Sequence, residues 1–164
     1  MKNKLLFPKN IYYVMLLLLL NSAAVFGQEA SDISHEAALK AVLAAKEKAE
    51  QSDVLVNIAV VDAGANLKAF IRMDDSFLGS IDIAIKKAKT SRYFDIDTGD
   101  LGKLSQPGGM IYNIELSNDG LVTFPGGVPL KNKEGKIIGA IGVSGGTIEQ
   151  DHEIATAAAI AIVE

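Results

Sequence analysis

The chain contains no cysteine. Disulfides, thiolate nucleophiles and cysteine-ligated metal sites are therefore excluded together. It also has only two histidines, His35 and His152, which leaves few imidazoles for a metal site or a proton-transfer pair. Without disulfides the fold must rely on an apolar core, and 164 residues give room for one domain that can bury such a core.

Long hydrophobic runs are also scarce. The one clean run, 11–20, is ten residues long, short of the roughly 20 that span a membrane. Basic residues precede it, and Val25-Phe26-Gly27 follows it as a plausible cleavage context. This layout predicts a secretory signal peptide over residues 1–27 and a periplasmic or secreted mature chain, with an uncleaved anchor as the alternative. A short disordered lead is expected over 28–33.

Basic residues are the minority among the charged ones. The chain has 16 Lys and Arg against 20 Asp and Glu. Removing Lys2, Lys4 and Lys9 with the leader leaves 13 against 20, a net charge of −7. An acidic domain is a poor candidate for nucleic-acid or anionic-membrane partners. We therefore expect neither nucleic-acid binding nor stable membrane insertion after cleavage.

Hydrophobic periodicity first predicts a helix followed by a hairpin. Ser34 is placed to cap a helix that runs to about Gln51, with its alanines and Val42 on one face. The valine-rich run 54–61 predicts a strand buried on both faces, and the half-polar run 67–73 predicts its antiparallel partner.

A second helix is expected to begin near residues 74–76 and to reach about Tyr93. Three of its lysines, Lys86, Lys87 and Lys89, fall mainly outside the apolar stripe.

The least regular part of the sequence follows this second helix. A long glycine-rich loop is expected over 95–110, with a short helix near 100–104 inside it. The segments 111–116 and 121–124 are expected as short extended pieces. Long irregular loops in compact domains are often functional.

A second hairpin is predicted from the runs 129–133 and 137–143. Gly139 and Gly142 lie inside the latter strand, which indicates that another backbone or a ligand approaches it closely. No internal repeat accompanies these elements.

The stretch 137–151, IIGAIGVSGGTIEQD, predicts a strand, a glycine turn and the start of a final helix over 148–163. Thr147 and Gln150 have the spacing of a capping box. The inner side of this helix is mostly alanine, and such a face packs closely against a sheet or a neighbouring subunit.

Few side chains suit a metal. Glu149, His152 and Glu153 share one helical face, but as residues of a first helical turn they also simply complement the helix dipole. His152 or His35 could serve as an axial ligand of haem iron, because haem needs only one or two protein ligands.

Catalytic motifs are incomplete. Gly142-Val-Ser-Gly145 is one residue short of a nucleophile elbow, and the glycine-rich loops match neither the phosphate-loop nor the dinucleotide fingerprint. The simplest interpretation of Arg72 and Lys89 is that both are solvated cations on the surface. If they line a pocket, they would suit propionates or another carboxylate.

Several segments in a fixed order resemble the GlcG/HbpS-type family of small haem-binding proteins, which also forms the C-terminal domain of PduO-type proteins. The segments are Ala59-Val-Val-Asp62 with Gly64 and Leu67, Phe70-Ile-Arg-Met-Asp74, Ala84, Lys87-Ala-Lys-Thr90, Gly126-Gly-Val-Pro-Leu130, Gly135, Ile138-Gly-Ala-Ile-Gly-Val-Ser-Gly-Gly146 and Gln150-Asp151. The resemblance covers about 34–163. The family pattern often has an acidic residue where this chain has His152.

The resemblance implies a single α+β domain after the signal peptide, over 34–164, with a profilin-like five-stranded antiparallel sheet and packed helices. It also implies a homo-oligomer and haem as the cofactor. The leading hypothesis is therefore an exported haem-binding protein that stores, senses or degrades haem. The expected cofactor-binding residues are Arg72, Lys89, Thr90, Gly126, Gly127, Asp151 and His152, and the expected iron ligand is His152 or His35.

Two other functions are compatible with the sequence. One is an enzyme on the same fold that acts on a small carboxylated or hydroxylated molecule, with Asp74, Lys89 or Asp151 as acid–base groups. The other is a structural or signalling protein that binds an exported partner through its alanine-rich helix.

Overall fold

The computed structural model describes residues 32–163, so the predicted signal peptide over 1–27 lies outside the described residues. The last residues of the predicted disordered lead are in fact ordered. Ile33 is buried and its N–H donates to the Ile138 carbonyl, at 2.8 Å. The Asp32 carboxylate accepts from the Ala63 N–H at 2.9 Å and pairs with Lys68 at 3.4 Å. These contacts fix the chain just before its first helix.

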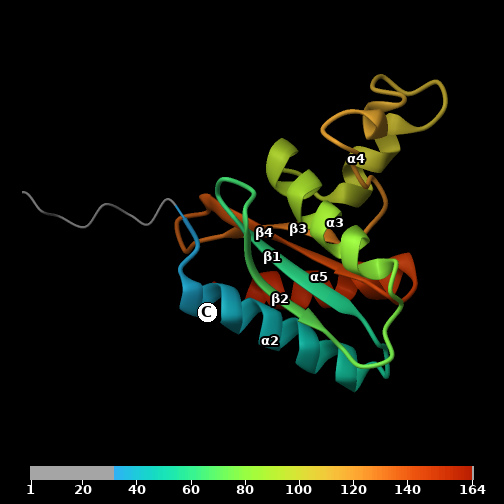
Figure 1. Cartoon of the computed structure of the whole chain (residues 1–164). Coiled ribbons are helices and arrows are strands. Elements are labelled where there is room, and N and C mark those ends of the chain that lie inside the picture. Colours follow the sequence, from blue (N-terminus) through green and yellow to red (C-terminus); the bar gives the residue numbers. More distant parts are fainter. Residues whose placement is uncertain (1–31, 164) are drawn as a thin grey trace, which may run out of the picture. The chain divides into compact units, whose positions relative to one another are not determined.

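A four-stranded antiparallel sheet forms the centre of the fold (Figure 1). Its strands are β1 (Asn57–Asp62), β2 (Leu67–Arg72), β3 (Gly127–Lys131) and β4 (Ile137–Ser144). Their order across the sheet is β2-β1-β4-β3. Both predicted hairpins, β1–β2 and β3–β4, are confirmed, although β3 begins two residues earlier than expected.

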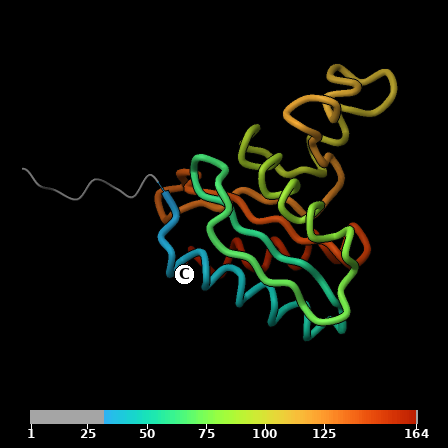
Figure 2. The backbone as a smooth tube through the Cα atoms, in the orientation of Figure 1, coloured from blue at the N-terminus to red at the C-terminus, as the bar shows by residue number. Residues whose placement is uncertain are grey.

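The prediction of a fifth strand is wrong for the described part of the chain. The segment 111–116 ends in a short 3-10 helix, η2 (Ile114–Leu116), and 121–124 is not a strand. Both fold onto each other, because the Glu115 carboxylate accepts hydrogen bonds from the Ser105 and Thr123 hydroxyls, each at 2.6 Å. The backbone of this region loops away from the sheet (Figure 2). Its polar groups are satisfied locally rather than by a sheet neighbour.

Helices cover both faces of the sheet. Helices α2 (His35–Gln51) and α5 (Ile148–Ala161) run antiparallel on one face, and α3 (Ser80–Phe94) lies on the other (Figure 1). The strand β1 alternates between two apolar clusters, with Ile58 and Val60 facing α2 and α5, and Ala59 and Val61 facing α3. The prediction that this strand is buried on both faces is therefore confirmed. Among residues 32–163, no helix has the length and apolar character needed to cross a membrane.

The caps of α2 and α5 follow the sequence. The Ser34 hydroxyl accepts from the Ala37 N–H at 3.1 Å. At α5, the Gln150 N–H donates to the Thr147 hydroxyl, and the Thr147 N–H donates to the Gln150 side chain, which completes the predicted capping box. Local hydrogen bonding alone determines both helix starts.

The start of α3 is later than predicted. Asp75 has φ of 61°, and the Ser76 hydroxyl donates to the Met73 carbonyl at 2.7 Å, so the 74–76 segment is a turn. The helix begins only at Ser80, after Gly79. The short helix expected inside the following loop is confirmed as α4 (Thr98–Ser105).

The alanine-rich side of α5 packs within the chain. Ala155 and Ala158 are fully buried in the cluster that also holds Ala38, Ala41 and Ala45 of α2. These small side chains allow the two helices to lie close together on the sheet. Of the two partners that the sequence allowed for this face, a sheet or a second subunit, the described residues supply the first together with α2.

Gly142 of β4 allows α3 to approach the sheet. A Cβ at this position would lie 2.1 Å from the Ala84 carbonyl oxygen and 2.5 Å from the Ala88 nitrogen. Backbone atoms in a helix cannot move aside independently, so only glycine fits. The prediction that another backbone approaches this strand is confirmed.

Replacing Gly142 by alanine should therefore destabilise the fold by about 1–3 kcal/mol, because the added methyl group overlaps the α3 backbone. Urea unfolding followed by circular dichroism measures the change. The matched control is Gly79→Ala, whose Cβ would have no heavy atom within 4 Å, and which should shift stability by less than about 0.5 kcal/mol. Equal effects of the two substitutions would contradict the close contact.

Candidate functional site

A buried ion pair connects the two sides of the sheet. Lys87 of α3 is 0% exposed and Asp151 of α5 is 2% exposed. The Lys87 Nζ lies 2.7 Å from the Asp151 Oδ2 and also donates to the Val143 carbonyl of β4, at 2.8 Å. The pair thus passes around the end of β4 and joins helices on opposite faces. Lys87, which the sequence pattern places mainly outside the apolar stripe of its helix, is therefore buried against the sheet.

Each member of the pair has further partners. The Asp151 Oδ1 accepts from the Gly146 N–H at 2.9 Å, and the Phe124 ring lies 4.7 Å from the Lys87 Nζ. Burial lowers the pKa of Lys87 and raises the pKa of Asp151, while the attraction between the two charges opposes both changes. Since every hydrogen-bonding oxygen of Asp151 is occupied, its carboxylate is a structural tie rather than a free acid–base group.

Glycines make room for the pair. Gly126 has φ of 117°, and a Cβ there would lie 2.7 Å from the Lys87 Nζ and 2.9 Å from the Asp151 Cβ. A Cβ at Gly127 would lie 2.5 Å from the Lys87 carbonyl oxygen. Gly126 and Gly127 are predicted to bind the cofactor, but the space beside their Cα atoms is filled by atoms of the protein itself. The loop 124–127 thus contacts the ion pair through Phe124 and Gly126.

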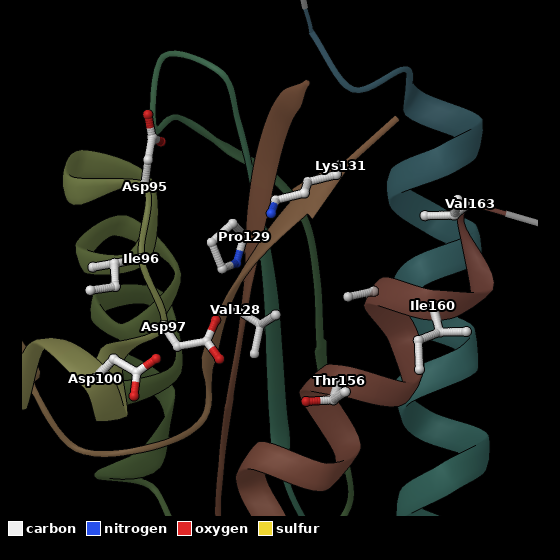
Figure 3. Close-up of a pocket in the computed structure, with 11 residues that line it drawn as sticks. Asp95, Ile96, Asp97, Asp100, Val128, Pro129, Lys131, Thr156, Ile160 and Val163 are labelled. Carbon is white, nitrogen blue, oxygen red and sulfur yellow. The ribbon is translucent and has the colours of Figure 1, made fainter. Parts of the chain in front are cut away.

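On the surface beside this loop lies a concave region that we call the α5 groove. It consists of two adjoining pockets of about 420 and 410 Å³ that share Asp97 and Asp100, and Figure 3 shows the first of them. Both volumes are within the range of small-molecule sites. The first pocket runs from the loop after α3 across the edge strand β3 to the last turns of α5, where Ile160 and Val163 give it an apolar wall.

The second pocket is lined mainly by polar side chains. Its residues are Asp97, Gly99, Asp100, Lys103, Pro125, Glu149, His152 and Glu153. Glu149, His152 and Glu153 do share one face of α5, as their spacing predicted. No group of three or more metal-ligating side chains within residues 32–163 has an arrangement that could hold a metal ion. The groove is therefore a possible ligand site with one imidazole and an excess of carboxylates.

Asp97 occupies the centre of the groove. It is the N-cap residue of α4, but its side chain makes no capping hydrogen bond. Instead it points from the loop toward β3 and α5 (Figure 3). Burial raises the pKa of Asp97, and the positive charge of the nearby His152 opposes this change. Asp97 and His152 both line the second pocket.

His152 itself is partly buried in the first turn of α5. Its Nδ1 atom is buried, and the described residues provide no hydrogen-bond partner for it. A buried ring nitrogen without a partner is uncommon in folded proteins. It marks His152 as the imidazole that a ligand or a neighbouring group would engage.

The other predicted site residues are dispersed. Arg72 lines a separate pocket with Lys46, Glu50 and Asp74, and the Thr90 hydroxyl accepts from the Val122 N–H at 3.1 Å. Lys89 is partly exposed on α3 but is not one of the described residues that line the α5 groove. The expectation of one pocket that contains Arg72, Lys89 and His152 together is therefore corrected, because the strands and α3 separate them.

His35 is exposed at the first residue of α2. Because α2 and α5 are antiparallel, His35 and His152 lie at opposite ends of the helix pair (Figure 1). They cannot ligate the same iron in one chain. The choice between them as an iron ligand remains a prediction, and the pocket favours His152.

Sequence reasoning did not identify Asp97 or the role of Lys87. Asp97 lies in the irregular loop region, where no periodicity indicates which side chains point inward. Lys87 stands between two other lysines, so composition alone predicts a solvated helix face. The available signals were the polar residue before a short helix and the lysine three residues after Ala84, on the same helical face.

Comparison with known proteins now places this arrangement in a family. A family model described as "Haem degrading protein HbpS-like" matches residues 33–160. The chain belongs to this HbpS-like family. The resemblance noted from the sequence segments is thereby confirmed.

The relatives include proteins of similar length and parts of longer ones. The chain is 41% identical over 132 residues to an uncharacterised 15.0 kDa protein of Citrobacter freundii, covering 80% of this chain and 92% of that protein. It is also 41% identical over 120 residues to the corrinoid adenosyltransferase PduO of Salmonella typhimurium, covering 73% of this chain. That match spans only 35% of PduO, about a third of its length.

Solved structures of HbpS-like proteins share the fold. The Klebsiella pneumoniae protein ORFY has 36% identity and a TM-score of 0.78, covering 84% of this chain and 94% of that one. A structure described as a PduOC:heme complex has 37% identity and a TM-score of 0.74, covering 79% and 94%. The Streptomyces reticuli HbpS double mutant has 30% identity and a TM-score of 0.71, covering 84% and 90%.

Breaking the buried pair should be costly. Lys87→Met leaves Asp151 buried without its counter-charge and should destabilise the protein by about 3–5 kcal/mol. Thermal and urea unfolding measure the loss. Lys89→Met, on the same helix but partly exposed, is the matched control and should change stability by less than about 0.5 kcal/mol. A Lys87→Met protein as stable as the control would show that the pair is not a structural tie.

Proposed function

We propose that this protein binds haem in the α5 groove, with His152 as the protein ligand of the iron. Membership of the HbpS-like family and similarity to a PduOC:heme complex support haem as the ligand. The single observation that carries the choice of site is His152, an imidazole with a buried, unpartnered ring nitrogen beside a pocket of about 410 Å³.

The composition of the groove fits haem in part. One imidazole is sufficient to hold haem iron, and the apolar wall at Ile160 and Val163 suits the flat, apolar porphyrin. Within the second pocket, however, Asp97, Glu149 and Glu153 would repel the propionates, and Lys103 is already paired with Asp100 at 2.7 Å. We infer that the propionates lie toward solvent or toward Lys131, the basic residue of the first pocket.

Haem, when bound, supplies a redox-active iron. The residues of this chain hold and shield it: His152 binds, the apolar end of the groove excludes water, and the buried Lys87–Asp151 pair fixes the first turn of α5 on which His152 stands. Storage, sensing and degradation of haem all rest on this binding step. The alternative acid–base enzyme loses support, because the Asp151 carboxylate is fully hydrogen-bonded and buried.

We further infer export and self-association. The leader pattern in residues 1–27 supports export. Several large apolar side chains are strongly exposed in the single chain, which favours contact with further copies. They are Phe77, Leu78, Met110 and Leu116, which are 72%, 71%, 88% and 82% exposed. Light scattering coupled to gel filtration measures the assembly size.

Haemin binding tests the proposed function. Titration of the purified protein should give a saturable Soret shift, and His152→Ala should weaken the affinity at least tenfold, or about 1.4 kcal/mol, because it removes the iron ligand. His35→Ala is the matched control, since it removes the other imidazole far from the groove, and it should leave the affinity unchanged. A spectrum of free haemin at micromolar wild-type protein would falsify haem binding, and loss with His35→Ala alone would relocate the site.

Expression of the full chain in a Gram-negative host tests export. We expect a periplasmic product whose intact mass corresponds to a chain beginning at Gln28. Leu17→Arg interrupts the apolar run and should retain the unprocessed chain in the cytoplasm. Recovery of wild-type protein with residues 1–27 attached would contradict cleavage.

A further inference from the structure

Two polar groups that line the second pocket have no hydrogen-bond partner in the described part of the chain, and one of them is a buried atom. The His152 Nδ1 is buried and, in the part of the chain that is described, unpartnered. The Asp97 carboxylate is half-buried, and no hydrogen bond or ion pair within residues 32–163 involves it. One group is a potential donor and the other an acceptor, and they line the same pocket.

The Asp97 side chain does not make the helix-capping hydrogen bond that its N-cap position would allow. An aspartate at an N-cap normally accepts a hydrogen bond from a backbone N–H of the first helical turn, which stabilises the helix. In α4 the Asp97 backbone carbonyl accepts from the Asp100 and Leu101 N–H groups, but the side chain does not cap the helix. It points into the groove instead (Figure 3).

The neighbouring carboxylates are less suited to pair with His152. Asp100 is engaged by Lys103 at 2.7 Å. Glu149 and Glu153 are exposed on α5 itself, where water satisfies them. Asp97 is the half-buried carboxylate that faces His152 from a different element, so it can orient the ring against the groove.

We propose that Asp97 is a positioning residue for His152, accepting a hydrogen bond from its Nδ1–H and thereby presenting Nε2 to the ligand. Histidines that bind a metal commonly donate their second ring N–H to a carboxylate, which fixes the tautomer and the ring orientation. The two side chains line the same pocket from different elements, and this hydrogen bond would give the buried Nδ1 its missing partner. This inference deepens the proposed function, because it rests on His152 being the iron ligand.

The tautomer of His152 in the haem-free protein tests the pair directly. Long-range proton–nitrogen NMR of the full-length protein at pH 8 distinguishes the Nδ1–H from the Nε2–H tautomer, and a His35→Gln background leaves one histidine signal. We expect the Nδ1–H tautomer in this background and a shift toward Nε2–H on adding Asp97→Asn. Glu149→Gln, in the same pocket, is the matched control and should leave the tautomer unchanged.

Haemin affinity provides the second readout. Asp97→Asn should weaken haemin binding about tenfold, the lower end of the effect of losing such a partner. Glu149→Gln removes an equal negative charge from the same pocket and should leave the affinity equal or tighter, because it relieves repulsion of the propionates. An Nε2–H tautomer before the Asp97 substitution, or a tautomer that Asp97→Asn does not change, overturns the inference. The tautomer measurements use haem-free protein, so they do not depend on haem binding. If the expected tautomer is found but haemin does not bind, the proposed function is overturned and the Asp97–His152 hydrogen bond is still supported.

Discussion

The need of one buried lysine for a counter-charge organises this fold. Lys87 is removed from water on α3, so it must find compensation inside the protein, and it finds it at Asp151 and the Val143 carbonyl. Because those partners belong to α5 and β4, the compensation fixes both faces of the sheet to each other. Gly126, whose Cβ would occupy the space of the pair, is a consequence of the same constraint.

The ion pair also determines where the candidate site lies. Asp151 immediately precedes His152 on α5. The ion pair with Lys87 that fixes Asp151 therefore also fixes the direction in which His152 leaves the helix. Phe124 and Gly126 of the loop 124–127 contact the pair, and Pro125 of this loop lines the pocket of His152. Two adjacent residues of one helical turn thus have different places. Asp151 is buried in the structural ion pair, and His152 lines the candidate binding groove.

The groove explains why family membership alone does not assign a ligand geometry. The HbpS-like family supplies haem as the expected ligand, but the cations that the sequence suggested for its propionates, Arg72 and Lys89, lie away from the groove. What the groove supplies is an apolar wall, one imidazole and several carboxylates. Haem bound in this groove, as proposed, would depend mainly on the iron ligand and on apolar contact, and less on pairing of its propionates with cations.

The sequence by itself determined the elements whose signals are local. The caps at Ser34 and Thr147, the two hairpins and the family segments all depend on neighbouring residues. Only the tertiary structure decided that Lys87 is buried and that 111–116 does not join the sheet. It also decided that Asp97 and His152 line the same pocket. In each case the deciding contact joins residues far apart in the chain, and periodicity carries no information about which distant charge or backbone will meet a given side chain.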